Sequence, residues 1–196
     1  MAIRKEIWLI LVLVLAILAI VSFMPFFTAN VEQADAKKFV EEDLRAKFPD
    51  AETGIVSIVE KKDDKGQKYF EVKARIIKYA DSACPERRHT YYSYPRQNFV
   101  TPPDEVIAYG CSACTDSSKQ CVIAFPEEAV VASHTFIGTE AVAQLIREDA
   151  AASHTVKETP NSWIVDWNSS AVGYYYEVEI SRSGAVLSVK RIDKKL

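Results

Sequence analysis

An apolar run with no helical or strand period opens the chain. Residues 7–27 carry no charge over 21 consecutive positions. About 20 apolar residues are enough for a helix to cross the hydrocarbon core of a bilayer. Arg4 and Lys5 precede the run and Glu32 is the first charge after it, so the positive-inside rule places the N-terminus in the cytoplasm. We expect a single-pass anchor within residues 1–29, with the remaining chain outside the cell membrane.

A cleaved secretory signal is the alternative reading of this run. Such signals have an apolar region of about 7–15 residues, which is shorter than the one found here. Small residues follow the run, at Thr28, Ala29, Ala34 and Ala36. We favour an uncleaved anchor because of the length of the run, and cleavage stays open because of those small residues.

Beyond the anchor, the apolar positions first repeat at helical spacing and then alternate. Asn30 is a candidate N-cap with Gln33 three residues later, and Pro49 ends the predicted helix. Residues 55–60 and 69–78 then have the composition and alternation of two antiparallel strands, joined by the charged turn 61–66. The predicted apolar stripe of the helix consists of Ala36, Phe39, Val40, Leu44 and Phe48.

The same order returns near the C-terminus at a constant offset of 106 residues. Thr139 is a candidate N-cap, and strands are predicted around residues 163–167, 174–180 and 186–192. Eight identical pairs, such as Glu71 and Glu177, support a duplicated unit, because a shared binary pattern alone fixes residue class rather than identity. The second helical stripe consists of Val142, Leu145, Ile146 and Ala150.

Residues 79–137 have no counterpart in the second copy. Residues 106–109 and 122–125 are predicted to form the two arms of a hairpin, with its tip at residues 110–120. The predicted fold is therefore α+β: one N-terminal transmembrane helix and two tandem units of a helix with an antiparallel sheet. We divide the exported part into a first unit at 30–137, which carries this cysteine-bearing β insert, and a second unit at 138–196.

The four cysteines, Cys84, Cys111, Cys114 and Cys121, all lie in the exported part. An even number outside the cytoplasm predicts two disulfides. Our first pairing joins Cys111 to Cys121 and Cys84 to Cys114. The second joins Cys84 to Cys111 and Cys114 to Cys121, and it stays open because spacing does not decide connectivity. A redox dithiol at Cys111 and Cys114 is an alternative. A zinc site formed by these two cysteines with Cys84 and Cys121 is another alternative, although structural zinc sites usually have two Cys-x-x-Cys motifs and this chain has one.

The C-terminal strands resemble the end of the PepSY domain, a cystatin-like α+β fold. The residues that carry the resemblance are the strand at 174–180, the turn, and the Gly184-Ala185-Val186-Leu187-Ser188-Val189 strand. The resemblance covers about residues 139–192, and more weakly 34–78. It implies an extracytoplasmic domain that binds or restrains a peptidase. Because PepSY domains carry no universal catalytic residues, it transfers none to this chain.

No catalytic, cofactor-binding or metal-binding pattern emerges from the other polar residues. His89, His134 and His154 fit no metal or triad spacing, and no phosphate loop, nucleophile elbow or zinc-protease motif is present. A net charge of −3 with no clustered basic face argues against nucleic-acid binding. We therefore expect no catalysis and no cofactor.

Three other residues are candidates for contact or modification. Tyr92 and Tyr175 are expected to point away from the tyrosines that form the sheet core, and tyrosine is enriched at protein interfaces. Asn168 begins an Asn-Ser-Ser sequence in a predicted turn, which is a glycosylation acceptor in hosts that glycosylate exported proteins.

The leading functional hypothesis is a membrane-anchored interaction module, whose partner is another envelope or membrane protein, such as a peptidase. An exported thiol-disulfide oxidoreductase that uses Cys111 and Cys114 is the first alternative. A pilin-like structural subunit is the second, because an apolar helix that runs into an amphipathic helix and then a sheet is also pilin geometry.

Overall fold

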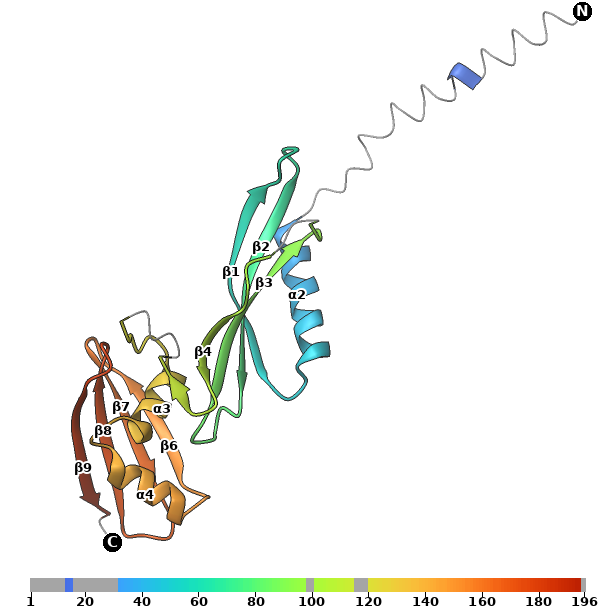
Figure 1. Cartoon of the computed structure of the whole chain (residues 1–196). Helices are drawn as coiled ribbons and strands as arrows, with labels where there is room; N and C mark the ends of the chain where they lie inside the picture. The colour runs from blue at the N-terminus through green and yellow to red at the C-terminus, as the bar shows by residue number, and fades with distance from the viewer. Residues whose placement is uncertain (1–12, 16–31, 98–100, 115–119, 195–196) are drawn as a thin grey trace, which may run out of the picture. The chain divides into compact units, whose positions relative to one another are not determined.

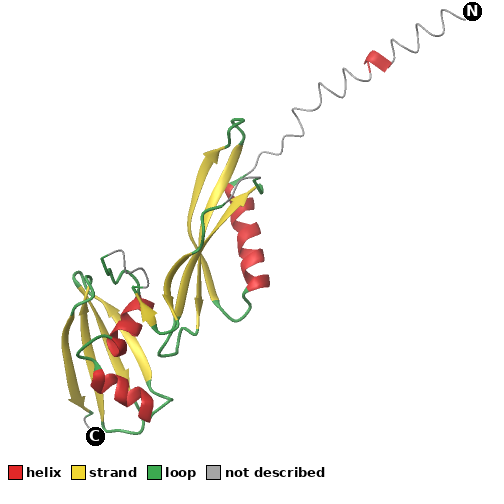
Figure 2. Ribbon diagram, viewed as in Figure 1, coloured by secondary structure: helices red, strands yellow, loops and turns green. Residues whose placement is uncertain are grey.

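Two antiparallel sheets and the helices packed against them make up the folded part of the protein (Figures 1 and 2). The computed structural model describes residues 13–15, 32–97, 101–114 and 120–194. Residues 33–196 belong to one unit, from which residues 1–32 are separate. The predicted α+β class and the predicted antiparallel sheets are thereby confirmed.

The first sheet has five strands in the order of the sequence, β1-β2-β3-β4-β5. The helix α2 packs against β1, β2 and β3 (Figure 1). Neighbouring strands are antiparallel throughout. The elements of this layer are α2 (Gln33–Lys47), β1 (Glu52–Lys62), β2 (Lys68–Lys78), β3 (Glu86–Tyr94), β4 (Glu105–Tyr109) and β5 (Ser112–Ala113).

The alternation in β2 explains how α2 is held. Every second side chain of this strand is apolar and buried, at Phe70, Val72, Ala74 and Ile76. On α2 the buried residues are Ala36, Val40 and Leu44, which share one helix face because they recur every four residues. The predicted stripe is confirmed at these three residues, whereas Phe39 at its edge is 44% exposed and contacts the ring of Tyr94.

The second sheet is a four-stranded meander in the order β6-β7-β8-β9. Two helices, bent by 94° at the break between them, precede it along the chain. Its core contains Trp163, Val165 and Trp167 of one strand and Val178 and Ile180 of the next. The elements are α3 (Pro126–Thr135), α4 (Glu140–Glu148), β6 (Ser153–Glu158), β7 (Ser162–Asn168), β8 (Tyr174–Ser181) and β9 (Val186–Asp193).

The helix α3 is buried on nearly all sides and packs against strands of both sheets. Seven of its ten residues are buried, and it contacts β4 and β5 as well as β6, β7 and β8. Pro126 begins the helix, where its missing N–H removes no hydrogen bond. The carboxylate of Glu128 accepts hydrogen bonds from the backbone N–H groups of Ala124 and Phe125, so it caps the helix start.

This helix overturns the predicted hairpin in the insert. The return arm of β4 is the short β5, and residues 122–125 form no strand. The reason is that Ile123 is held from outside the insert: its N–H bonds to the carbonyl of Arg182, and its carbonyl accepts from Trp163 Nε1. The apolar residues at 122–125 therefore lead into α3 and contribute to the core of the second sheet.

The second helical stripe is predicted correctly only in part. Val142 and Leu145 are buried, but α4 ends at Glu148, so Ala150 lies outside the helix and is exposed. The strand β6 occupies residues 153–158, which correspond at the offset of 106 to the last residue of α2, the loop that follows it and the first residue of β1. The proposed boundary at residues 137 and 138 stays a prediction.

The predicted anchor at residues 7–27 lies outside the described residues, apart from the helical segment 13–15. Within the described part of the chain, no single helix combines the length and apolar composition of a membrane span; α3 and α4 meet both criteria only when taken together.

Candidate functional site

The cysteines form two disulfides, Cys84–Cys111 and Cys114–Cys121. This is the second of the two predicted pairings, and the first is wrong. A turn at Gly110 and Cys111, both with φ near +57°, reverses the chain between β4 and β5 and brings Cys111 beside Cys84, with their Cα atoms 4.6 Å apart. The two cysteines of the Cys-x-x-Cys motif are therefore bonded to different partners.

A groove at one end of the first sheet is lined by Tyr109, two residues before Cys111, and by Glu86, two residues after Cys84. The groove has a volume of about 430 Å³, and the buried side chains of Ile76 and Ala108 contribute to its lining. Three large side chains that line it are unusually exposed: Tyr79 by 65%, Tyr109 by 63% and Val106 by 50%. Exposed apolar side chains gathered around one concavity are typical of a binding surface.

The turn that carries Tyr79 has a strained conformation. Tyr79 has φ 55°, which is uncommon for a residue other than glycine. Ser82 holds this turn, because its N–H and its hydroxyl both donate to the carbonyl of Tyr79, at 2.9 and 2.8 Å. Cys84 follows two residues later and its N–H donates to the Ser82 hydroxyl, so the disulfide and the turn together hold the Tyr79 backbone in place.

Two cations lie together along the same groove. The side chains of Lys78 and Arg88, on β2 and β3, both lie over the ring of Phe48, at 5.9 and 4.9 Å from its centroid. Among the described residues, Arg88 has one ion pair, with Asp104 at 3.8 Å, and both side chains of this pair are more than a third exposed. Glu86 is the acidic side chain among the described lining residues of the groove.

A network of charged side chains occupies the opposite face of the first sheet, centred on Glu105 of β4. Its carboxylate accepts hydrogen bonds from Lys73 Nζ at 2.7 Å, from Tyr91 Oη, and from His89 Nδ1 at 3.2 Å. The hydrogen bonds from Lys73 and Tyr91 lower the pKa of Glu105 to about 2. This network lies on the face opposite α2, because Lys73 and Tyr91 alternate with buried residues that face α2.

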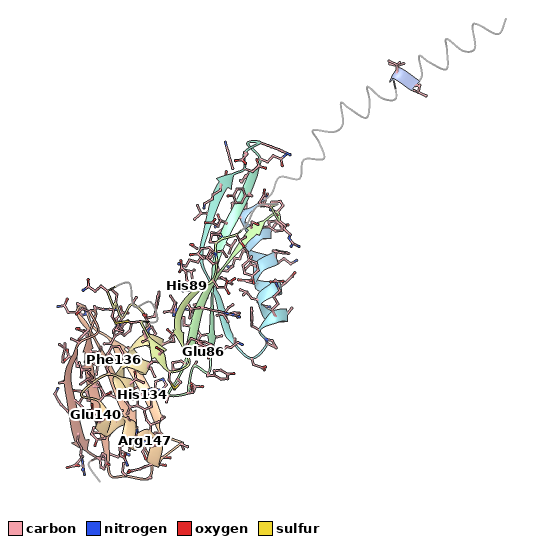
Figure 3. All side chains as sticks on the ribbon, in the orientation of Figure 1. Glu86, His89, His134, Phe136, Glu140 and Arg147 are labelled. Carbon is pink, nitrogen blue, oxygen red and sulfur yellow. A yellow bond between two sulfur atoms is a disulfide. The ribbon has the colours of Figure 1, made fainter. Side chains whose placement is uncertain are left out.

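A buried ion pair continues this network towards α3. Arg87 Nη1 donates to Glu127 Oε2 at 3.0 Å, and the two side chains are only 6% and 10% exposed. The guanidinium also stacks on the Phe125 ring, 3.9 Å from its centroid. Arg87 Nη2 donates to His89 Nε2 at 3.4 Å. Burial lowers the pKa of His89, which favours the neutral imidazole, and with Nε2 accepting from Arg87 the Nδ1–H is the donor to Glu105. Figure 3 labels His89 within the first sheet.

The other two histidines flank one tryptophan of the second sheet. His134 contacts Trp167 edge to face at 5.5 Å, and His154 lies tilted against it at 5.1 Å. His134 Nε2 also donates to the carbonyl of Ala83 at 2.7 Å, which ties α3 to the segment beside the first disulfide. Burial lowers the pKa of both imidazoles. In the described part of the chain, no group of three or more His, Cys, Asp or Glu is placed to hold a metal ion.

The structure places the remaining predicted residues on several surfaces. Tyr92 lies on the face that α2 covers, with Lys47 Nζ 5.8 Å from its ring centroid. The expectation that Tyr92 points away from the core is therefore wrong, and its neighbour Tyr91 points away instead. Burial and a hydrogen bond to Asp43 raise its pKa. Tyr175 is paired with Asn168 across β7 and β8 on the face opposite the core, and Asn168 is exposed. Their roles in contact and glycosylation stay predictions.

The residues around the groove were not predicted from the sequence. Tyr79 and Tyr109 follow no amphipathic period, and they come together only because β3 lies between β2 and β4. Arg87 and Glu127 are 40 residues apart, so no local pattern connects them. One local signal was present: a glycine and a cysteine directly follow Tyr109, which marks a tight turn with an exposed side chain before it.

No family model, curated protein or solved structure matches this chain.

Proposed function

We propose that the protein is a membrane-anchored, extracytoplasmic interaction module without catalysis of its own. Its partner is another envelope or membrane protein, with peptidases as one class. The observation that carries this proposal is the groove at the end of the first sheet, where two exposed tyrosines and a valine surround a concavity. Tyrosine is enriched at interface hot spots, where it presents a large contact area.

The rest of the chain is consistent with this role. Two disulfides suit an oxidising compartment outside the cytoplasm. An anchor at residues 7–27 would keep the groove close to a membrane-bound partner and raise its effective concentration. The charged side chains on the face of the first sheet opposite α2 satisfy one another: Glu105 is held by three donors, and Arg87 by Glu127. Such an arrangement suits a rigid surface better than proton transfer.

Site-specific photo-crosslinking in intact membranes tests the proposal. A benzophenone amino acid replaces Tyr109 in the full chain, and a matched position in the exposed β1–β2 turn, Lys65, serves as the control. A third position, Tyr175, tests the surface predicted from the sequence. We expect one discrete adduct from position 109 and none from position 65. If none of the three positions gives a discrete adduct with another protein, the interaction module is the wrong function.

A further inference from the structure

The groove combines an apolar floor with a cationic wall, and this combination restricts what it can bind. The inference rests on the proposed function, because it specifies the partner of the same site. The floor and rim include Ile76, Ala108 and Val106. Tyr79 and Tyr109 add two exposed rings, and the 430 Å³ volume is in the range of pockets that take a small ligand or a few side chains. One large apolar side chain fits this part of the groove.

The cationic wall is formed by Lys78 and Arg88. Both cations lie within 6 Å of the same Phe48 ring centroid, and the register of β2 and β3 makes them diagonal neighbours on one face of the sheet. Lys78 has no ion pair within 4 Å among the described residues, and the Asp104 partner of Arg88 is 3.8 Å away and exposed. Exposed pairs of this kind contribute little free energy, so a carboxylate from a partner can replace Asp104 at low cost. Glu86 offsets one of the two positive charges and leaves the wall cationic.

We propose that this groove binds a segment of the partner protein in which a large apolar side chain stands next to a carboxylate. The apolar side chain lies on the Ile76 and Val106 floor between the two tyrosines. The carboxylate binds Arg88 and Lys78, and the planar guanidinium provides the two-pronged contact that carboxylates favour. The strained turn at Tyr79 and the Cys84–Cys111 disulfide fix the backbone on one side of the groove, which lowers the entropy lost on binding.

A phage-displayed library of random heptapeptides, selected on the full-length protein in nanodiscs, tests this inference. We expect the enriched peptides to contain a large apolar residue adjacent to Asp or Glu. Their binding should fall roughly tenfold or more in Tyr109→Ala and in Arg88→Glu, as is typical when a hot-spot residue is removed. Lys78→Glu is the second charge-reversal variant, and near-ultraviolet circular dichroism checks that each variant is folded.

Two matched variants on the second layer serve as controls. Leu187→Ala removes a large apolar side chain that is 55% exposed, and Arg147→Glu reverses an exposed charge on α4; neither should change peptide binding. The inference is overturned if no peptide is enriched, if the enriched peptides lack acidic residues, or if they bind the groove variants as well as the wild type. It is also overturned if the adduct from position 109 is a second copy of the chain or a polysaccharide.

These outcomes separate the two proposals. If photo-crosslinking at Tyr175 captures a partner but the groove variants change nothing, the interaction module stands and the groove inference falls. If no position captures a partner and no peptide is enriched, both fall.

Discussion

Removing one partner of the buried Arg87–Glu127 ion pair should destabilise the protein strongly. The two side chains are 6% and 10% exposed, and Arg87 Nε already has no hydrogen-bond partner among the described residues. In Glu127→Ala the guanidinium would therefore remain in the protein interior with its charge uncompensated. Breaking a buried pair in this way costs about 3–5 kcal/mol. For a chain of this size, that loss corresponds to a decrease in melting temperature of about 6–20 °C.

The exposed pair Lys68–Glu60 is a matched control, because its N–O distance is also 3.0 Å while its side chains are 44% and 51% exposed. Glu60→Ala should cost about 1 kcal/mol or less. Replacing both buried partners, in Arg87→Met with Glu127→Leu, should be much less harmful than either single change, because no buried charge remains.

Urea denaturation of the full chain with its disulfides intact compares the wild type with Glu127→Ala, Glu60→Ala, Arg87→Met, Glu127→Leu and the double variant. The fluorescence of Trp163 and Trp167 follows unfolding, because both rings are in the core of the second sheet. The reasoning is refuted if Glu127→Ala loses no more stability than Glu60→Ala. It is also refuted if the double variant loses as much as Arg87→Met and Glu127→Leu added together.

Three other predictions follow from particular groups. First, burial lowers the pKa of His89, His134 and His154 below 6.5, so the folded state favours their neutral form. Stability to urea should be full above about pH 6.5 and fall as the pH drops through that value. This fall in stability should be smaller in His134→Gln. A urea midpoint that does not change between pH 7.5 and 5.5 would contradict this. Second, Gly184→Ala places a Cβ 2.8 Å from Cys121 Sγ at φ +81°, whereas Gly66→Ala at φ +77° meets nothing within 4 Å. Both should cost about 1 kcal/mol in backbone strain, with an additional loss only at position 184, and equal melting temperatures would be evidence against the contact. Third, the 27-residue separation of the Cys84–Cys111 disulfide should make its removal by paired Ala substitutions about 1 kcal/mol more costly than removal of Cys114–Cys121, with a separation of 7. Chemical denaturation compares the two, and the reverse order would show that loop entropy does not dominate.

The local patterns predicted the elements that are amphipathic over their whole length. The alternation of Phe70, Val72, Ala74 and Ile76 located β2, and the stripe of Ala36, Val40 and Leu44 located α2, because each element has one buried and one exposed face. The helix α3 has no such pattern, because both sheets cover it. A short apolar segment that is buried on all sides has no period to reveal whether it is a helix or a strand.

The candidate site was less accessible to prediction for a different reason. The four cysteines indicated that the insert is cross-linked, but their pairing depended on the turn at Gly110, which the sequence placed inside a longer hairpin tip. The partners of Glu105 come from β2 and β3, and Lys73 is 32 residues away along the chain. Their proximity depends on strand register, which side-chain spacing within one strand does not reveal.

The helix α3 contacts both sheets, so we expect the two sheets to respond together. Glu127 of this helix is paired with Arg87 of the first sheet, and Ser133 on the same helix accepts from Trp167 Nε1 of the second. Loosening the first sheet therefore frees the helix that covers the core of the other. A ligand that stabilises the groove would slow hydrogen exchange at the backbone amides of β7 and β8, although it contacts neither strand. The protection of those amides from exchange thus reports on events at Tyr109.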